Sequence, residues 1–335
     1  MKEAFFYEQQ DSERLKCFLC PRYCLIKPGQ RGFCYVRKNI GGRLIALSYN
    51  RPYAINVDPV EKKPLYHFLP GTQILSIGTA GCNLACKFCQ NWELCKAEEH
   101  SRKSMEIPPE RVVQMGFHYD TASIAFTYNE PTVFAEYAMD ISGLARKHHI
   151  RSVMVSNGYI TPEAIDSVYA DIDAANIDLK AFTDRFYQKY TLSYLEPVLF
   201  TLKRLQELGV WIEITNLVIP GLNDDEKELT RLCEWVISEL GPDVPLHFTA
   251  FHPDYKLKDR HSTTPSSLIR IRKQAQEIGL NYVYLGNISD GEGSDTYCPQ
   301  CSNVLVQRSW YSVKIKNFKN GHCTNCGREI PGIFS

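Results

Sequence analysis

The stretch GTAGCNLACKFCQNW, residues 78–92, places Cys82, Cys86 and Cys89 in one loop directly after the apolar run ILSIGT. Thiolates at such close spacing suit a soft metal ion or an iron–sulfur cluster. A structural zinc ion needs four ligands that close a tetrahedron. Three ligands on a four-iron cluster would instead leave one iron open to a small molecule. The loop therefore predicts a [4Fe–4S] cluster with one free corner, rather than three small residues buried in a crowded turn.

Residues 74–286 continue from this loop as an alternation of short β-branched runs and amphipathic stretches. The predicted strands are 74–79, 123–128, 152–157, 174–179, 211–219, 246–251 and 281–286. Nearly continuous apolar runs of this length are typical of strands buried on both faces. Helices are predicted at 131–148 and 161–170, each with a proline in its first turn, and at 224–240, beginning at Asp224 or Asp225. The alternation predicts an α/β fold, a partial (open) βα barrel of about six units.

Polar and glycine-containing segments follow the predicted strands, at the ends where parallel α/β folds place their chemistry. They are GTAGC, YNEPT, SNGY, DLKAF, IPGLND and FHPDYK. The glycine in SNGY permits close approach of the backbone to a ligand. Asp178 and Lys180 alternate along one strand, so both side chains can point to the same face. We expect all six segments to share one rim.

Charge and hydropathy narrow the cellular setting. The chain has 335 residues with 38 basic and 38 acidic side chains, so no net field favours nucleic acid or an anionic membrane. No apolar run approaches the ~20 residues that span a bilayer, and the N-terminal residues lack the apolar centre of a signal peptide. These features predict a cytoplasmic protein. Thirteen cysteines in that compartment argue for metal rather than for disulfides.

Two further groups of four cysteines lie near the ends of the chain. Two CxxC pairs about twenty residues apart are typical of a structural zinc ribbon, with iron as the alternative. They are Cys298, Cys301, Cys323 and Cys326. The second group either closes another zinc site or holds an auxiliary iron–sulfur cluster. Its members are Cys17, Cys20, Cys24 and Cys34.

Of the two remaining cysteines, Cys95 has no partner at a useful spacing and Cys233 lies on an apolar helix face, so both are predicted to be buried free thiols. The predicted organisation has three parts. Residues 1–73 form a cysteine-rich N-terminal segment with a hairpin at 46–58. Residues 74–286 form the partial barrel, and residues 287–335 form a zinc-ribbon-like module.

The spacing Cys82-x3-Cys86-x2-Cys89, with Phe88 before the last cysteine, resembles the signature of the radical S-adenosylmethionine (SAM) superfamily. The segments CQNW, FTYNEPT, SNGY, IDLK, LVIPGLND and FHPDY resemble the activating enzymes of glycyl-radical enzymes, pyruvate formate-lyase activating enzyme among them. CFLCPRYCLIKPGQRGFC, DPVEKKPLYHFLPG and CPQC…CTNCGREIPG extend the likeness over nearly the whole chain, to the AmmeMemoRadiSam system radical SAM enzymes. The resemblance implies SAM, a ferredoxin or flavodoxin electron donor, and partners of the AMMECR and Memo types.

The same resemblance implies roles in SAM binding for residues of two segments. Glu130, with Asn129 beside it, would hold the amino group of SAM through a charge-assisted hydrogen bond. The alternative is a capping motif before the next helix. Ser156 and Asn157 would lie near the ribose and the methionine portion, and the alternative is an ordinary turn.

Three residues further along the chain complete the predicted site. Lys180 would meet the carboxylate of SAM and Asp178 the ribose or the substrate, with a buried ion pair between these two residues as the alternative. His252 would lie near the SAM carboxylate, or else cap the last strand. One departure from the family matters, because Thr215 and Asn216 stand where glycyl-radical activating enzymes carry an arginine.

The sequence therefore predicts an enzyme that reductively cleaves SAM to a 5′-deoxyadenosyl radical, which abstracts hydrogen from an unknown substrate. That substrate is either a glycine of a partner protein or a small molecule, and Thr215 favours the small molecule. The alternative from another class is a non-catalytic, zinc-stabilised binding protein. Such a protein would have no reason to keep Cys82, Cys86, Cys89 and Glu130 together.

Overall fold

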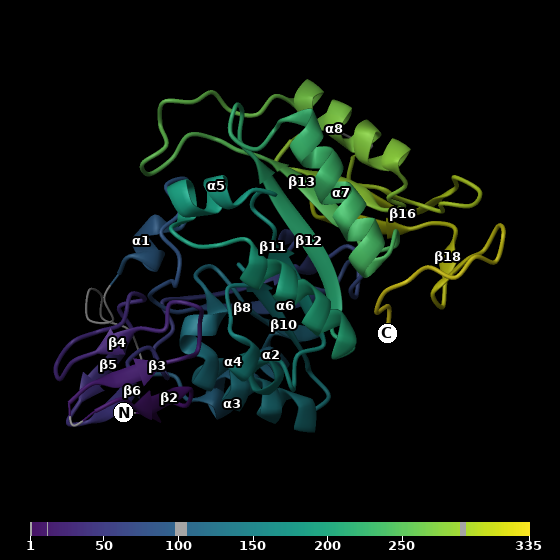
Figure 1. Cartoon of the computed structure of the whole chain (residues 1–335). Helices are drawn as coiled ribbons and strands as arrows, with labels where there is room; N and C mark the ends of the chain where they lie inside the picture. The colour runs from purple at the N-terminus through teal and green to yellow at the C-terminus, as the bar shows by residue number, and fades with distance from the viewer. Residues whose placement is uncertain (1, 12, 98–105, 289–292) are drawn as a thin grey trace. The chain divides into compact units, whose positions relative to one another are not determined.

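The computed structural model describes residues 2–11, 13–97, 106–288 and 293–335 (Figure 1). The chain divides into two compact units. The first contains residues 1–58, 73–175 and 196–210, and the second contains residues 59–72, 176–195 and 211–335. These units do not follow the ranges 1–73, 74–286 and 287–335. The functional division into those three ranges stays a prediction.

Strands and helices alternate along most of the described chain, as Figure 1 shows. In order they are β8 (Gln73–Gly78), α2 (Pro109–His118), β9 (Ser123–Phe126), α3 (Ala135–Lys147), β10 (Arg151–Ser156), α4 (Pro162–Val168), β11 (Ala174–Asp178), α6 (Glu196–Glu207), β12 (Trp211–Val218), α7 (Glu226–Leu240), β13 (Leu246–Ala250), α8 (Pro265–Ile278) and β14 (Val283–Gly286). Shorter turns of helix are η1 (Val60–Lys62), α1 (Trp92–Cys95), η2 (Pro131–Phe134), α5 (Asp184–Phe186) and the π-helical η3 (Tyr187–Thr191). The predicted α/β fold with about six βα repeats is confirmed.

Each predicted strand lies within two residues of its expected ends. The predicted helix 131–148 divides into η2 and α3, because Glu130 caps a 3₁₀ turn that precedes the α-helix. Helix α7 begins after Asp225, whose carboxylate accepts the backbone N–H of Glu228 at 3.1 Å. Such an N-cap supplies a partner for one of the free N–H groups of the first turn.

In the first unit the sheet has the order β10-β9-β8-β7, where β7 spans Ala54–Pro59. Strand β9 pairs in parallel with β8 and with β10, and Ser123 lies opposite both Ile74 and Arg151. All residues of β9 are buried, and so are all residues of β8 except the first. The apolar runs are therefore covered on both faces, as predicted for parallel strands.

The N-terminal part of the same unit forms two small antiparallel sheets, which include the segments around the first four cysteines. Their strands are β1 (Lys2–Glu3), β6 (Arg43–Ala46) and β5 (Arg37–Ile40) in one, and β2 (Tyr7–Gln9), β3 (Leu15–Cys17) and β4 (Leu25–Ile26) in the other. The predicted hairpin at 46–58 is wrong, since β6 pairs with β5 and β1 while β7 joins β8. The hairpin instead joins β5 to β6 through Gly41 and Gly42, whose φ angles of +59° and +79° suit a two-residue turn.

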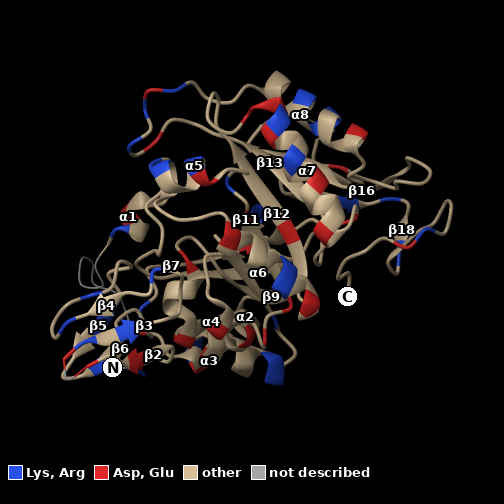
Figure 2. Cartoon of the chain, viewed as in Figure 1, with Lys and Arg blue, Asp and Glu red and all other residues tan. Residues whose placement is uncertain are grey.

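In the second unit the sheet has the order β14-β13-β12-β11, with β13 parallel to β12 and β14. The C-terminal strands are β15 (Thr296–Tyr297), β16 (Val304–Ser309), β17 (Ser312–Ile315), β18 (Phe318–Lys319) and β19 (His322–Cys323). Buried residues of these strands share a core with Tyr282 and Tyr284 beside and on β14. Both signs of charge occur along α7 and α8 (Figure 2). Within the described ranges, no helix has both the length and the apolar character to cross a membrane.

Candidate active site

The cysteine loop begins where β8 ends. A Cβ atom at Gly78 would lie 2.7 Å from the carbonyl oxygen of Thr127, so only glycine lets β8 approach the segment after β9 this closely. Beyond it, Cys82 is buried while Cys86 and Cys89 are half-buried, and none of the three forms a disulfide. Three reduced thiols are thus placed at the carboxyl end of the first strand of the series.

The sulfur of Cys82 accepts two N–H groups. The backbone N–H of Leu84 lies 3.4 Å from it, and Nδ2 of Asn157 lies 3.8 Å from it. Donors of this kind stabilise a thiolate, which is the form that binds metal. The local structure therefore favours Cys82 as a metal ligand.

The spacing of the three sulfurs suits a cluster better than a single ion. Among the described residues, only the four C-terminal cysteines bring three or more possible ligand atoms within 4.8 Å of one another. A tetrahedral zinc ion with Zn–S bonds of about 2.3 Å holds its sulfurs about 3.8 Å apart. In a [4Fe–4S] cluster each cysteine binds a different iron, so the cysteine sulfurs lie farther apart. Cys82, Cys86 and Cys89 fit the donor set of a [4Fe–4S] cluster.

Asn129 holds the backbone of the cysteine loop. Its Oδ1 accepts the N–H of Thr79 at 2.9 Å, and its Nδ2 donates to the carbonyl oxygens of Ala80 and Gly81 at 3.1 and 2.8 Å. The side chain is 6% exposed, so these bonds replace water that the loop cannot reach. The structure thus gives Asn129 a positioning role next to Cys82. The proximity of YNEP to the cysteines was predicted, but this contact was not.

Glu130 joins the ends of two neighbouring strands. Its Oε1 accepts the N–H of Thr132 at 3.0 Å and the hydroxyl of Ser156 at 2.7 Å, and its Oε2 accepts the N–H of Asn157 at 2.8 Å. Burial raises the pKa of the Glu130 carboxyl, and these hydrogen bonds oppose the shift. Glu130 therefore caps η2, as the alternative interpretation expected. Its predicted role with the amino group of SAM stays a prediction.

Hydrogen bonds join four predicted residues of the first unit, and the fifth, Asn129, bonds to the backbone just before Cys82. Asn157 links Glu130 to Cys82, and its Nδ2 also donates to Oδ1 of Asn83 at 2.9 Å. Ser156 and Asn157 are both nearly fully buried. Cys82, Asn129, Glu130, Ser156 and Asn157 thus lie together at one end of the first unit's sheet.

Asp178, Lys180 and His252 belong to the second unit. Nζ of Lys180 lies 2.9 Å from Oδ2 of Asp178, so these residues form an ion pair, although the pair is partly exposed rather than buried as the alternative interpretation expected. His252 is exposed in the loop after β13. Thr215 donates to Oδ1 of Asn176, and the neighbouring Asn216 donates to the carbonyl of Leu179. The implied SAM contacts of Asp178, Lys180 and His252 stay predictions.

Cys95 was expected to have no partner, and the structure places it against the cysteine loop. It ends helix α1 and is buried, and the carbonyl oxygen of the preceding residue, Leu94, accepts the N–H of Gly81 at 3.1 Å. Hydrogen bonds with Cys82 and Cys89 raise the pKa of the Cys95 thiol. The sequence signal that could have indicated this contact was the short distance along the chain, since Cys95 lies only six residues after Cys89.

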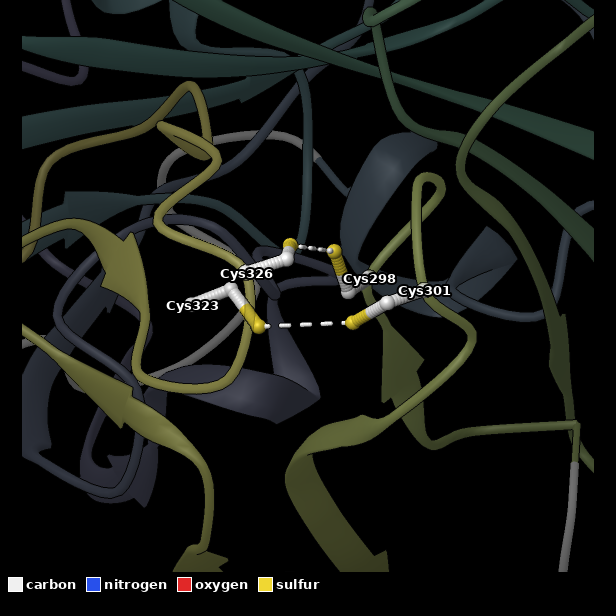
Figure 3. A group of neighbouring side chains, drawn as sticks. All are labelled: Cys298, Cys301, Cys323 and Cys326. Carbon is white, nitrogen blue, oxygen red and sulfur yellow. Dashed lines mark hydrogen bonds between the residues drawn. The ribbon is translucent and has the colours of Figure 1, made fainter.

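The four C-terminal cysteines converge, as Figure 3 shows. The sulfurs of Cys298 and Cys326 lie 3.5 Å apart, and those of Cys301 and Cys323 lie 3.6 Å apart. The backbone N–H of Asn303 and the side chain of Asn325 lower the pKa of the Cys301 thiol to about 6. These distances match the edges of a tetrahedral zinc site.

The second unit also contains a buried carboxylate that sequence reasoning noted only as a nearby charge. Glu213 in β12 accepts the N–H groups of Tyr66 and His67 at 3.0 and 2.7 Å, and Nε2 of His247 lies 2.6 Å from Oε2. Burial opposes its ionisation, but the hydrogen bond from His247 and the charge interactions with His247 and His67 outweigh burial and lower the pKa of Glu213, and the N–H of Tyr66 adds to the shift. The carboxylate ties residues 66–67 to β12 and β13. An acidic residue inside the apolar strand WIEITNLV was the available signal.

Comparison with known proteins gives one family and several relatives. Residues 76–233 match the family described as the radical SAM superfamily. An uncharacterised protein of Methanocaldococcus jannaschii is 43% identical over 336 residues, and the match covers 100% of both chains. The pyruvate formate-lyase-activating enzyme of Clostridium pasteurianum is 21% identical, over 59% of this chain and 88% of that protein.

Two solved structures share the fold. A radical SAM methyltransferase from Sphaerobacter thermophilus superposes with a TM-score of 0.50 and 13% identity, over 65% of this chain and 67% of that chain. Streptococcus suis SuiB superposes with a TM-score of 0.50 and 13% identity, over 68% of this chain and 51% of that chain. At this identity the likeness concerns the fold alone.

Proposed function

Because the chain belongs to the radical SAM superfamily and is therefore an enzyme, we propose that it cleaves SAM reductively at a [4Fe–4S] cluster held by Cys82, Cys86 and Cys89. When bound, the cluster supplies one electron to the sulfonium of SAM, which releases methionine and a 5′-deoxyadenosyl radical that abstracts hydrogen from the substrate. The observation that carries the proposal is the spacing of three thiols on a loop that Asn129 and Asn157 hold in place.

Glu130 is the residue of the first unit best suited to the ammonium group of SAM. Its Oε2 accepts one hydrogen bond, from Asn157, and a carboxylate oxygen carries two lone pairs. One acceptor position is therefore left for a charge-assisted hydrogen bond. Ser156 and Asn157 fix the orientation of the carboxylate, since they donate hydrogen bonds to its oxygens from the end of the neighbouring strand β10.

The substrate we favour is a small molecule rather than a glycine of a partner protein. Strand β12 offers Thr215 and Asn216 in place of the family's arginine, and both side chains donate hydrogen bonds within the second unit. Beside the cysteine loop, a cavity of about 400 Å³ is lined by Tyr53, Ala54, Gln90, Asn91, Trp92, Glu93, Leu94 and Tyr128. That volume is in the range of small-molecule pockets. A ferredoxin or flavodoxin donor and partners of the AMMECR and Memo types stay predictions.

The test is anaerobic reconstitution with iron and sulfide, followed by dithionite and SAM. We expect 5′-deoxyadenosine from the reconstituted protein and none from Cys86→Ala. The matched control is Cys233→Ala, which removes a buried thiol on α7 and leaves the cysteine loop intact. If protein that contains this cluster forms no 5′-deoxyadenosine, the proposed function is wrong.

We also propose that Cys298, Cys301, Cys323 and Cys326 hold a structural zinc ion. The support is the pair of Sγ–Sγ distances near 3.5 Å and the burial of Cys298 and Cys323 in the core of the module. A closed set of four thiolates leaves no position for substrate, so the ion would stabilise rather than react. Metal analysis of the purified protein should find about one zinc per chain at this site.

A further inference from the structure

The N-terminal cysteines lie in the first unit and face one another. Cys17 ends β3, and its N–H donates to the carbonyl of Cys24 at 3.0 Å. All four cysteines line one cavity, together with Arg22 and Arg37. Cys17 and Cys34 are buried, and Cys20 and Cys24 are half-buried. Four reduced thiols therefore line one cavity.

Backbone N–H groups point at these sulfurs in the pattern of a metal-binding knuckle. The N–H of Arg22 donates to Cys20 and that of Val36 donates to Cys34, in each case from two residues farther along the chain. The C-terminal site shows the same pattern, where the N–H of Asn303 donates to Cys301. The N-terminal loops are therefore built to hold metal-bound thiolates.

The spacing of the sulfurs separates the two kinds of metal site. No three of the N-terminal sulfurs come within 4.8 Å of one another, whereas the C-terminal four do, in a comparison made over the described residues. The N-terminal set shares this wider spacing with Cys82, Cys86 and Cys89. A single tetrahedral ion would require sulfurs about 3.8 Å apart. A [4Fe–4S] cluster, in which each cysteine binds its own iron, accommodates the wider set.

A buried cation lines the same cavity. Arg37 is 2% exposed and pairs with Glu136 through two hydrogen bonds of 3.0 and 2.9 Å. The N–H of its Nε has no hydrogen-bond partner within the described part of the chain, and Arg37 lines the cavity of the four cysteines. Four thiolates around an iron–sulfur core carry net negative charge, and their sulfurs accept hydrogen bonds from such donors. The cluster would thus have one buried N–H group beside it, Nε of Arg37, that has no other partner in the described structure.

The N-terminal set is also packed directly on the cysteine loop. A Cβ atom at Gly81 would lie 2.5 Å from the carbonyl oxygen of Cys34, so the two backbones are in contact. On the other side of Cys82, the carbonyl of Asn83 accepts Nε of Arg22 at 2.7 Å. Both neighbours of Cys82 in the sequence therefore contact the segment that contains the N-terminal cysteines.

From these contacts we infer that Cys17, Cys20, Cys24 and Cys34 hold an auxiliary iron–sulfur cluster that passes electrons to the cluster at Cys82. The relay role rests on the proposed function, whereas the metal assignment does not. One electron from a low-potential protein donor of the ferredoxin or flavodoxin class reduces the auxiliary cluster. The same electron moves on to the SAM-binding cluster, so the auxiliary cluster returns to its starting oxidation state and the donor is oxidised by one electron.

Iron counting tests the metal assignment separately from catalysis. After anaerobic reconstitution, the triple variant Cys82→Ala/Cys86→Ala/Cys89→Ala should retain about four irons per chain and, after dithionite, the electron paramagnetic resonance signal of a reduced cluster. The double variant Cys20→Ala/Cys24→Ala removes the two half-buried thiols. It should contain about four irons per chain fewer than the unaltered reconstituted protein. Cys233→Ala should lose none. A triple variant with zinc and no iron would overturn the assignment.

Two electron donors test the relay. The Cys20→Ala/Cys24→Ala variant should still form 5′-deoxyadenosine with dithionite, a small reductant that needs no docking site. With reduced flavodoxin the variant should lose this activity, whereas unaltered protein should keep it. An unchanged flavodoxin-driven rate in the variant would overturn the relay. If unaltered protein forms no 5′-deoxyadenosine with dithionite, the proposed function fails, and the iron counts still decide the metal assignment.

Discussion

At the scale of the residue, Asn129 shows how one buried amide determines the shape of a metal-binding loop. It contacts the backbone of Thr79, Ala80 and Gly81, which immediately precede Cys82. Carbonyl groups in such a loop have no helix or sheet partner, so they depend on a side chain. The family resemblance placed Asn129 with the SAM-binding residues, and the structure adds that it supports the ligands themselves.

Asn129→Ala should destabilise the metal-free protein by about 2–3 kcal/mol, because it leaves buried backbone groups without partners. It should also speed the loss of iron from reconstituted protein. Urea unfolding and the rate of iron release to a chelator measure the two effects. The control is the exposed Asn317→Ala, which should change stability by less than about 0.5 kcal/mol. Equal effects of the two substitutions would contradict the positioning role.

His67 is a second residue whose surroundings make a specific prediction. Its ring lies 2.8 Å from the carbonyl oxygen of Pro331 and 2.7 Å from the hydroxyl of Tyr284. Burial lowers the pKa of His67 from 6.5 to about 4, although Glu213 opposes the shift. The unfolded chain therefore binds a proton at this residue between about pH 6.5 and pH 4, and the folded protein does not.

Stability should fall as the pH drops from 6.5 to 4, and His67 should account for up to about 3 kcal/mol of the loss. Glu213, whose pKa is lowered from 4.5, adds to the loss only as the pH falls below that value. Urea unfolding of metal-free protein at several pH values measures the slope. His67→Gln should flatten it and the exposed His322→Gln should not. An unchanged slope in His67→Gln would show that other groups cause the acid sensitivity.

At the scale of the element, the loop after β8 is shaped by glycines as much as by cysteines. Gly81 has a φ of +90° and lies against the carbonyl of Cys34 and the side chain of Val36. Gly29 has a similar φ of +75° but no atom within 4 Å of a Cβ position. Both glycines thus need a positive φ angle, but only Gly81 is also packed closely against neighbouring atoms.

Gly81→Ala should destabilise the metal-free protein clearly more than Gly29→Ala. The left-handed conformation alone costs roughly 1–2 kcal/mol with a side chain present. At Gly81 the new methyl group would in addition displace the Cys34 segment from the cysteine loop. The midpoint of urea unfolding compares the two variants. If they are equally stable, the contact between the two cysteine segments contributes little.

At the scale of the whole molecule, the C-terminal cysteines are part of the second unit's core. Cys298 and Cys323 are buried together with Tyr282, Tyr284 and Leu305. Metal binding at such a site is coupled to folding, because the unfolded chain does not hold the ligands together. We therefore expect zinc to stabilise the core of the second unit, and not only the short strands that carry the cysteines.

Cys326→Ser should remove about one zinc per chain and destabilise the protein by roughly 3 kcal/mol or more. Metal analysis and thermal unfolding measure the two outcomes. Cys233→Ser is the control, since it changes a buried thiol outside any cysteine group. Loss of zinc with no change in thermal unfolding would contradict a structural role.

The fold was predictable from local pattern, with one clear failure. Apolar runs bounded by glycine and polar residues identified the strands, since burial on both faces leaves a strong local signal. The hairpin at 46–58 was wrong because a short strand can pair with any free edge, and its partner is chosen by tertiary packing. Thus β6 joined β5 and β1, while β7 joined β8.

The chain itself determined the cysteine spacings, the βα alternation and the clustering of polar segments at strand ends, because these depend only on the order of residues. The partners of each polar group were decided by the tertiary structure. Only folding brings Asn129 to Gly81, Cys95 to Cys82 and Cys34 to Gly81, across many intervening residues. The distance between sulfurs was decided in the same way. Equal numbers of cysteines at the two ends of the chain converge to different spacings, because backbone packing around them sets how closely they meet.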